Sequence, residues 1–172
     1  MTKNLSIIGN VNVAEIAISI VAAGYWAAFW AMNGLDKFLN RSDIGPFNWY
    51  GKDRVDQFTT YFLRLEISPD SINSVLCFAG VWELFVAIPL LVAIVAMVWR
   101  PGSTTARSTL YWSYFLSGIT LIGFSVFDVV AGDRAELREH GLYFALLMAC
   151  CLWARFSLSP KENLPLSSTA GN

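Results

Sequence analysis

Four long apolar stretches divide this chain, and they limit its possible folds more than any other feature. They cover residues 13–38, 70–98, 107–131 and 139–158, and each is close to the roughly 20 residues that span a bilayer. They lack the polar face that each helix of a soluble protein needs. Only 15% of the residues are charged, against about 25% in an average soluble domain. The sequence therefore predicts an all-α, polytopic membrane protein folded as an antiparallel four-helix transmembrane bundle.

The longest connection, residues 39–69, joins the first two spans. Two glycines and a proline make its first half irregular. The following segment, "DQFTTYFLRLEI", places aromatic and aliphatic side chains on one helical face. We expect a short amphipathic helix here that lies in the membrane interface or caps the bundle. Ser68 and Pro69 then predict the start of the second span, as N-cap and first helical residue.

Residues 1–158 are expected to form one membrane domain, followed by a disordered tail at 159–172. An even number of spans places both termini on one side of the membrane. The loop after the second span carries Arg100 and Arg107 and no acid, which favours cytoplasmic termini. The opposite side carries slightly more lysine and arginine in total, but these residues are interleaved with acids. We expect an integral protein of a prokaryotic plasma membrane with its termini in the cytoplasm.

Antiparallel threading brings most ionisable groups in or near the spans to one mouth of the bundle. Glu83 lies deeper, ~13–20 Å along the second span at a rise of 1.5 Å per residue. A charge at the centre of a membrane costs about 2.5–3.5 kcal/mol on insertion scales, so such a residue is a functional-site hypothesis by default. The other polar residues at this mouth are Asn33, Asp36, Lys37, Asp128, Arg134, Glu136, Glu139 and His140.

Glu83 stands between Trp82 and Leu84 in an otherwise apolar run, and three explanations are open. Lys37 has a flexible stem and can reach inward to pair with Glu83 or with Asp128. Glu83 can instead stay protonated and donate a hydrogen bond to a neighbouring helix or to a carbonyl ligand. The charged residues can also form an ion-pair network that only fixes the packing of the helices.

His140 is the only histidine in the sequence. Close to Asp128, it is a candidate proton carrier or ligand to a bound group, but one histidine cannot hold a haem b between two histidines. No metal-ligand spacing, phosphate loop or dinucleotide fingerprint occurs, and the three cysteines are typical small apolar residues. We expect no metal site and no covalently bound cofactor. The formal net charge of −1 gives no case for nucleic acid binding.

Three segments of the sequence resemble the DoxX-like family of small membrane proteins. These are "NGLDKFLN", "GVWELFVAIPLLVAIVAMVWRPG" and "ELREHGLYFALLMACCLWA", and the resemblance covers about residues 15–157. It implies a four-helix membrane bundle. Members include a subunit of an archaeal thiosulfate:quinone oxidoreductase and proteins linked to redox stress. The positions that match the family motifs are Gly34, Lys37, Phe38, Gly80 and Glu83.

The leading functional hypothesis is a membrane subunit of a quinone-linked oxidoreductase. A quinone would enter sideways from lipid with its head group near Glu83, Lys37 and Trp30, and Trp82 would stack on its ring. Other membrane or peripheral redox subunits would supply electrons. One alternative is a non-catalytic accessory or assembly subunit that docks a larger complex through residues 39–69. Another is a bundle that binds a lipid ligand, and a homo-oligomer is compatible with each of these hypotheses.

Overall fold

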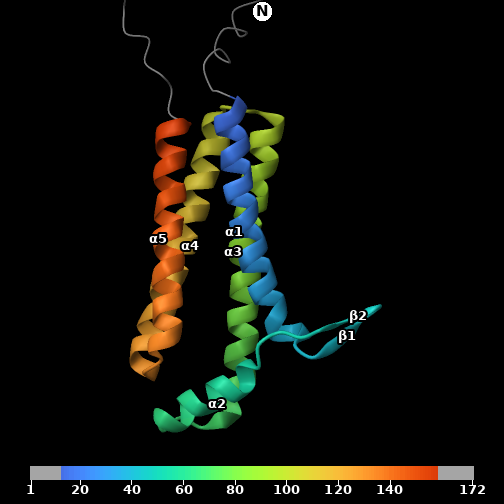
Figure 1. Ribbon diagram of the computed structural model, residues 1–172, viewed down its shortest axis with the longest axis vertical. Helices are drawn as coiled ribbons and strands as arrows, with labels where there is room; N and C mark the ends of the chain where they lie inside the picture. The colour runs from blue at the N-terminus through green and yellow to red at the C-terminus, as the bar shows by residue number, and fades with distance from the viewer. Residues whose placement is uncertain (1–12, 159–172) are drawn as a thin grey trace, which may run out of the picture.

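Four long helices form the body of the molecule, as a computed structural model of residues 13–158 shows (Figure 1). All four are long and apolar enough to cross a membrane, and they pack antiparallel. The predicted fold class is therefore confirmed. The predicted tail at 159–172 lies outside the described residues. The helices are α1 (Val13–Leu39), α3 (Ile72–Trp99), α4 (Thr104–Ala131) and α5 (Arg134–Ser157).

The connection after α1 contains a hairpin and a short helix. The hairpin consists of β1 (Ser42–Ile44) and β2 (Phe47–Trp49), and it projects to the side of the bundle (Figure 1). Helix α2 (Arg54–Arg64) then crosses the end of the bundle opposite the start of α1. A 3-10 turn, η1 (Pro69–Ser71), leads into α3. The sequence predicted the short helix but not the hairpin.

Helix starts are fixed by local capping, and two of them differ from the predicted spans. Ser103 accepts a hydrogen bond from the backbone N–H of Ala106, so α4 begins at Thr104 rather than at residue 107. Asp133 caps α5, which begins at Arg134 rather than at residue 139. The charged segment just before residue 139 is thus part of α5. An N-cap side chain satisfies backbone donors that have no partner within the helix.

Ser68 caps the turn before α3, as predicted from its position before Pro69. Its side chain accepts a hydrogen bond from the backbone N–H of Asp70. This cap belongs to η1, and α3 itself begins three residues after Pro69, at Ile72. The sequence signal therefore marks where the chain turns back into the bundle.

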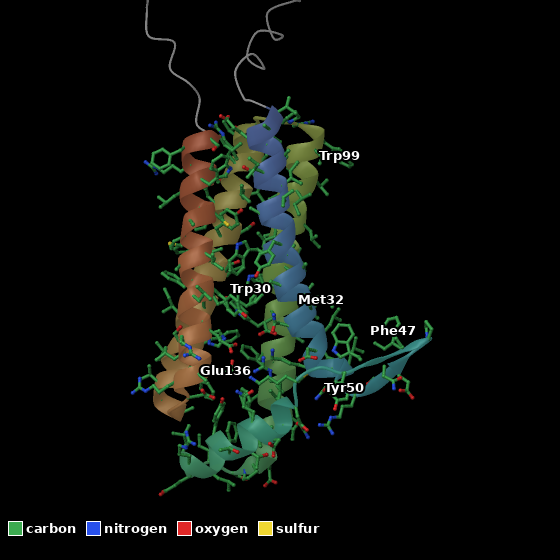
Figure 2. The ribbon with its side chains drawn as sticks, in the orientation of Figure 1. Trp30, Met32, Phe47, Tyr50, Trp99 and Glu136 are labelled. Atoms are coloured by element: carbon green, nitrogen blue, oxygen red, sulfur yellow. The ribbon has the colours of Figure 1, made fainter. Side chains whose placement is uncertain are left out.

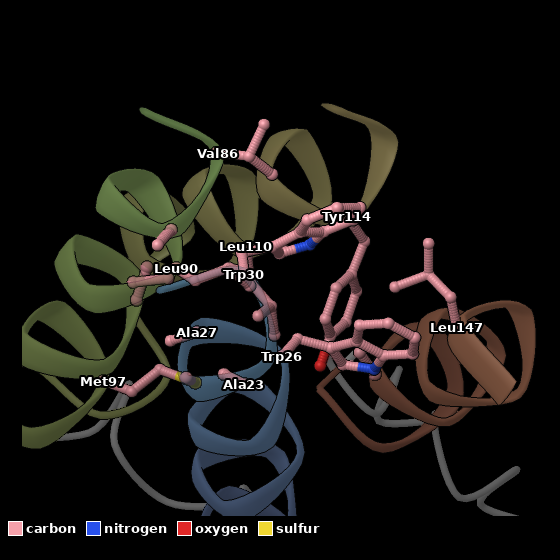
Figure 3. Packing of buried hydrophobic residues seen from close by; sticks show 14 of the residues in the cluster. Ala23, Trp26, Ala27, Trp30, Val86, Leu90, Met97, Leu110, Tyr114 and Leu147 are labelled. Atoms are coloured by element: carbon pink, nitrogen blue, oxygen red, sulfur yellow. The ribbon is translucent and has the colours of Figure 1, made fainter. Parts of the chain in front are cut away.

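Large aromatic side chains fill the centre of the bundle (Figure 3). Trp26, Trp30 and Tyr114 are almost fully buried, together with aliphatic residues of α3, α4 and α5. The indole N–H of Trp30 donates to the Ser117 hydroxyl over 2.9 Å. Ser117 in turn donates to the carbonyl of Ser113 within α4. These small hydroxyl residues let α4 pack closely while satisfying their own polar groups.

The outer surface of the long helices is apolar. On α3, for example, Phe78, Val81, Phe85 and Ile88 are each more than half exposed. An apolar surface of this kind suits a lipid environment rather than water. The four helices therefore indicate an integral membrane protein. Its polar groups lie inside the bundle or at its ends.

Candidate functional site

A partly enclosed cavity of about 70 Å³ lies at the mouth of the bundle that α2 covers. A single water molecule needs roughly 10–15 Å³ of such space, so the cavity has room for several atoms of a ligand. All four long helices and α2 contribute to its walls. Its aromatic lining consists of Phe29, Trp30, Phe58, Tyr61, Phe124 and Phe127.

Lys37 and Glu83 form a buried ion pair in this cavity. The Lys37 Nζ donates to Glu83 Oε2 over 2.5 Å, and the two side chains are 7% and 3% exposed. Helical side chains lean toward the N-terminus of their own helix. Because α1 and α3 are antiparallel, Lys37 leans into the bundle and Glu83 leans toward the mouth, so the two meet. Of the explanations for Glu83, pairing with Lys37 is the one that the geometry supports.

Two glycines place this ion pair at a close crossing of α1 and α3. A Cβ atom on Gly34 would lie 2.9 Å from the carbonyl oxygen of Gly80. A Cβ on Gly80 would lie 3.1 Å from the carbonyl oxygen of Gly34. Only glycine leaves room for backbones this close. Lys37 and Glu83 each follow their glycine by three residues, about one helical turn.

Asp128 and His140 form a second polar pair in the same cavity. His140 Nδ1 lies 2.6 Å from Asp128 Oδ2, and both side chains are largely buried. The ring of His140 also packs against Phe124, with ring centroids 5.4 Å apart. A carboxylate that holds one ring nitrogen fixes the orientation of the imidazole and leaves the other nitrogen to exchange protons. This pair joins α4 to α5, whereas Lys37 and Glu83 join α1 to α3.

Helix α2 closes the mouth through Glu136 in the first turn of α5. Glu136 accepts hydrogen bonds from Lys52 and from Gln57, the latter over 3.0 Å, and Arg54 lies 3.5 Å away. Arg64, at the other end of α2, donates to the carbonyl of Ala131 over 2.6 Å. Polar contacts therefore hold α2 to α4 and α5 at both of its ends.

Tyr61 and Asp133 add a contact outside the membrane-spanning segments. The Tyr61 hydroxyl donates to Asp133 Oδ2 over 2.5 Å. This bond and the backbone N–H groups of Glu136 and Ala135 hold the pKa of Asp133 below its ordinary value. Burial, and then the hydrogen bond to Asp133, raise the pKa of Tyr61. At neutral pH, Tyr61 is a neutral donor and Asp133 a charged acceptor.

Arg54 presents a buried donor to the cavity. Its Nε atom is inaccessible to solvent and has no hydrogen-bond partner, although Arg54 Nη1 donates to Gln57 Oε1 over 2.8 Å. A buried donor without a partner carries a free-energy cost of roughly 1–3 kcal/mol. A ligand or water molecule that accepts a hydrogen bond from Arg54 would remove that cost.

The structure gathers six of the eight predicted site residues around the cavity. Trp82 does not line it, because its indole N–H donates to the Thr120 hydroxyl over 3.1 Å. Asp36 also lies outside the lining. It accepts hydrogen bonds from the Trp49 indole and from the backbone N–H of Lys52, and so anchors the connection to α1. The six residues that line the cavity are Trp30, Asn33, Lys37, Glu83, Asp128 and His140. Trp30 contributes its ring, because its N–H donates to Ser117.

The sequence analysis missed the contribution of α2 to the site. Arg54, Gln57, Phe58 and Tyr61 all line the cavity. Their spacing of three, four and seven residues from Arg54 places them on one face of a helix. The sequence predicted this segment as an amphipathic helix that lies in the interface or caps the bundle, so its polar side chains were not expected in the site.

Residues 13–158 contain no cluster of three or more histidine, cysteine or acidic side chains that could hold a metal ion. The polar groups of the cavity are instead arranged as acid–base pairs. Such pairs can donate and accept hydrogen bonds and carry protons.

Comparison with known proteins finds no match for this chain. No protein-family model matches it, and neither a curated protein nor a solved structure shows significant similarity. The chain folds as a four-helix membrane protein with a partly enclosed cavity at one mouth, lined by aromatic and ionisable side chains.

Proposed function

We propose that this chain is the quinone-binding membrane subunit of an oxidoreductase complex, with the head group bound in the mouth cavity. The observation that carries the proposal is that two buried acid–base pairs share one aromatic-lined cavity. Lys37–Glu83 and His140–Asp128 each combine a proton donor with a carboxylate. A quinone head group is an apolar ring with two carbonyl acceptors, and this cavity offers matching walls and donors.

Proton supply is the chemistry that the two pairs would contribute. Reduction of a quinone to a quinol consumes two electrons and two protons, which add at the two carbonyl oxygens. Under the proposal, each pair delivers one of these protons, and a partner subunit delivers both electrons. Arg54 would donate a hydrogen bond to a carbonyl through its unpartnered Nε. Such donors stabilise negative charge that develops on the oxygen.

The tail of the quinone would leave the bundle between α1 and α5. These helices pack against each other far less than α1 packs on α3 or α4 on α5. Phe29 and Tyr143 bridge the seam, with ring centroids 4.9 Å apart. Two aromatic rings can rotate apart more easily than a closely packed helix pair, so this seam is the proposed lateral path from lipid.

The motif likeness to the DoxX-like family agrees with this proposal. The matched positions Gly34, Lys37, Gly80 and Glu83 form the close crossing of α1 and α3 and the ion pair beside it. In this chain the four motif residues thus act together: the two glycines allow the close crossing that brings the lysine and the glutamate into contact. A DoxX-like relationship is therefore part of the proposal, and its implied link to quinone chemistry supports the same function.

Quantifying the quinone that co-purifies with the protein tests the proposal. The full chain would be purified from membranes in mild detergent, extracted with organic solvent, and its quinone measured chromatographically per mole of protein. We expect quinone in the wild type and in Trp82→Phe, a control outside the cavity. We expect a large loss in Glu83→Gln and in His140→Gln. Absence of quinone from the wild type, or equal amounts in folded variants, would contradict the proposal.

Topology is the remaining part of the proposal. The basic loop with Arg100 and Arg107 argues for cytoplasmic termini, which places the cavity on the opposite side of the membrane. A cysteine introduced at the exposed Asp56 of α2 should react with an impermeant maleimide in intact cells. If the cysteine reacts only after the cells are opened, the cavity lies on the cytoplasmic side and the orientation is the opposite of the one proposed.

A further inference from the structure

The β1–β2 hairpin has one apolar face that the described chain covers only in part, because Phe47 is exposed whereas Ile44 and Trp49 are half-buried. Ile44 pairs with Phe47, and Ser42 pairs with Trp49, so these four side chains share a face. Asp43 pairs with Asn48 on the opposite face, and both are exposed. The hairpin is therefore amphipathic. An isolated two-stranded hairpin is at best marginally stable in water, so its apolar face requires a covering environment.

The position of the hairpin points to the membrane as that environment. It leaves the bundle sideways, roughly across the direction of the helices, rather than extending beyond their ends (Figure 1). Trp49 fixes its height, because its indole N–H donates to Asp36 in the last turns of α1 over 2.7 Å. An element at this height that runs sideways from a transmembrane helix lies along the membrane surface.

Helix length agrees with this placement. Helix α3 has 28 residues, or about 42 Å at 1.5 Å per residue, close to the 40–45 Å of a bilayer including its headgroup regions. Trp99, which is 80% exposed, marks the far end of α3 (Figure 2). The hairpin lies near the other end, at the level expected for the second interface. Aromatic residues are enriched at both interfaces of membrane proteins.

The side chains of the hairpin are oriented for insertion. Figure 2 shows Phe47 on the side of the hairpin turned toward the middle of the bundle, the side on which Met32 projects from α1. Phe47 is 57% exposed and Met32 is 50% exposed. The apolar face of the hairpin thus continues the lipid-facing surface of α1. Its polar face is directed away from the membrane interior.

We infer that the hairpin is an interfacial anchor, which inserts the face formed by Ile44, Phe47 and Trp49 among the lipid headgroups and upper acyl chains. Trp49 and the N–H of Lys52 both bond to Asp36, and Lys52 also pairs with Glu136 on α5. The anchor is therefore connected directly to the segment that carries α2 across the mouth. Lipid contact at the hairpin would hold that segment at a fixed depth in the membrane.

Depth-dependent fluorescence quenching tests this inference. The full chain, with its three cysteines replaced by alanine, would carry a bimane probe at Phe47→Cys or, as a control, at Asn48→Cys on the opposite face. Each variant would be reconstituted in vesicles of phosphatidylcholine and phosphatidylglycerol that contain nitroxide-labelled lipids. Circular dichroism and monodispersity would confirm that both variants remain folded.

We expect the Phe47 probe to be quenched several-fold more strongly by nitroxides on the upper acyl chain than the Asn48 probe. Aqueous iodide should show the reverse preference. If iodide quenches both probes equally and lipid nitroxides quench neither, the hairpin lies in water. If the Phe47 probe is shielded from iodide but unaffected by lipid nitroxides, a protein covers this face. Either result would overturn the inference.

Discussion

Gly34 of α1 and Gly80 of α3 bring their backbones into contact one helical turn from the buried Lys37–Glu83 pair. Close approach at this crossing places the ammonium and the carboxylate within bonding distance across two helices. The geometry of the cavity therefore depends on two residues that have no functional group of their own.

Replacing Gly34 by alanine tests this crossing. The added methyl group would meet the Gly80 carbonyl oxygen and the Leu84 backbone nitrogen at 2.9 and 3.1 Å. Neither backbone atom can move aside easily, so we expect a loss of about 1–3 kcal/mol in the free energy of unfolding. Gly24→Ala in the same helix meets no atom within 4 Å and should be neutral or stabilising by up to ~1 kcal/mol. Unfolding in detergent, followed by circular dichroism, measures both, and equal effects would be inconsistent with a tight crossing.

The Lys37–Glu83 pair should behave as a coupled unit. Lys37→Met leaves a buried carboxylate without its partner, which destabilises a protein by about 3–5 kcal/mol. The double variant Lys37→Met/Glu83→Leu should recover most of this loss, because it removes both charges together. A double-mutant cycle of unfolding free energies measures the coupling.

The exposed pair Arg41–Asp53 provides the control for this cycle. Its side chains are 66% and 41% exposed, so its coupling should be at most about 1 kcal/mol. If the Lys37 and Glu83 substitutions simply added their effects, the two residues would not interact as the geometry indicates.

The sequence was sufficient to predict the fold class, because apolar stretches of this length allow few alternatives to membrane-spanning helices. It also predicted that Asp128, His140 and Lys37 would meet at one mouth, since antiparallel threading fixes which helix ends lie together. Which carboxylate pairs with which cation was harder to predict. Lys37 had two carboxylates within conceivable reach, and only the crossing of α1 and α3 selects Glu83.

The hairpin and the role of Trp82 could not be read from the sequence for physical reasons. The strands have only three residues each, too few for an alternating pattern to stand out. Trp82 is next to Glu83 in the chain, but consecutive residues of a helix point about 100° apart. Its N–H consequently faces Thr120 instead of the cavity.

Closure of the mouth by α2 should depend on Glu136. Glu136→Gln removes the charge that Lys52, Arg54 and Gln57 approach together, so α2 should open more often. Hydrogen exchange of residues 54–64, measured by mass spectrometry, should become faster. Glu139→Gln, an exposed site on the same helix, should leave this exchange unchanged. Unaltered protection of α2 in Glu136→Gln would show that the other contacts of α2 hold the helix in place without Glu136.

The Tyr61–Asp133 contact predicts a pH-dependent contribution to stability. The pKa of Asp133 is lowered in the folded protein, so its stabilisation is complete above the unfolded value of about 3.9. It is lost as pH falls through the lower folded value. Tyr61→Phe removes the hydrogen bond that contributes most to this lowering. The stability gap between wild type and Tyr61→Phe should therefore be constant near neutral pH and shrink below about pH 4.

Thermal unfolding in detergent across this pH range measures the gap. Tyr50→Phe serves as the control, because Tyr50 is 85% exposed and its substitution should have little effect at any pH. A gap between wild type and Tyr61→Phe that stays equally large at acid and neutral pH would assign the effect to packing of α2, not to Asp133.

Binding of a water-soluble, short-tailed quinone to the purified protein tests the proposed function most directly. Calorimetric titration would compare the wild type with Lys37→Met/Glu83→Leu, the double variant expected to keep the fold, and with Trp82→Phe. The wild type and Trp82→Phe should bind the quinone with similar affinity. The double variant should bind at least about tenfold more weakly, corresponding to about 1.4 kcal/mol. No binding by the wild type, or equal binding by the folded double variant, would contradict a quinone site at this mouth.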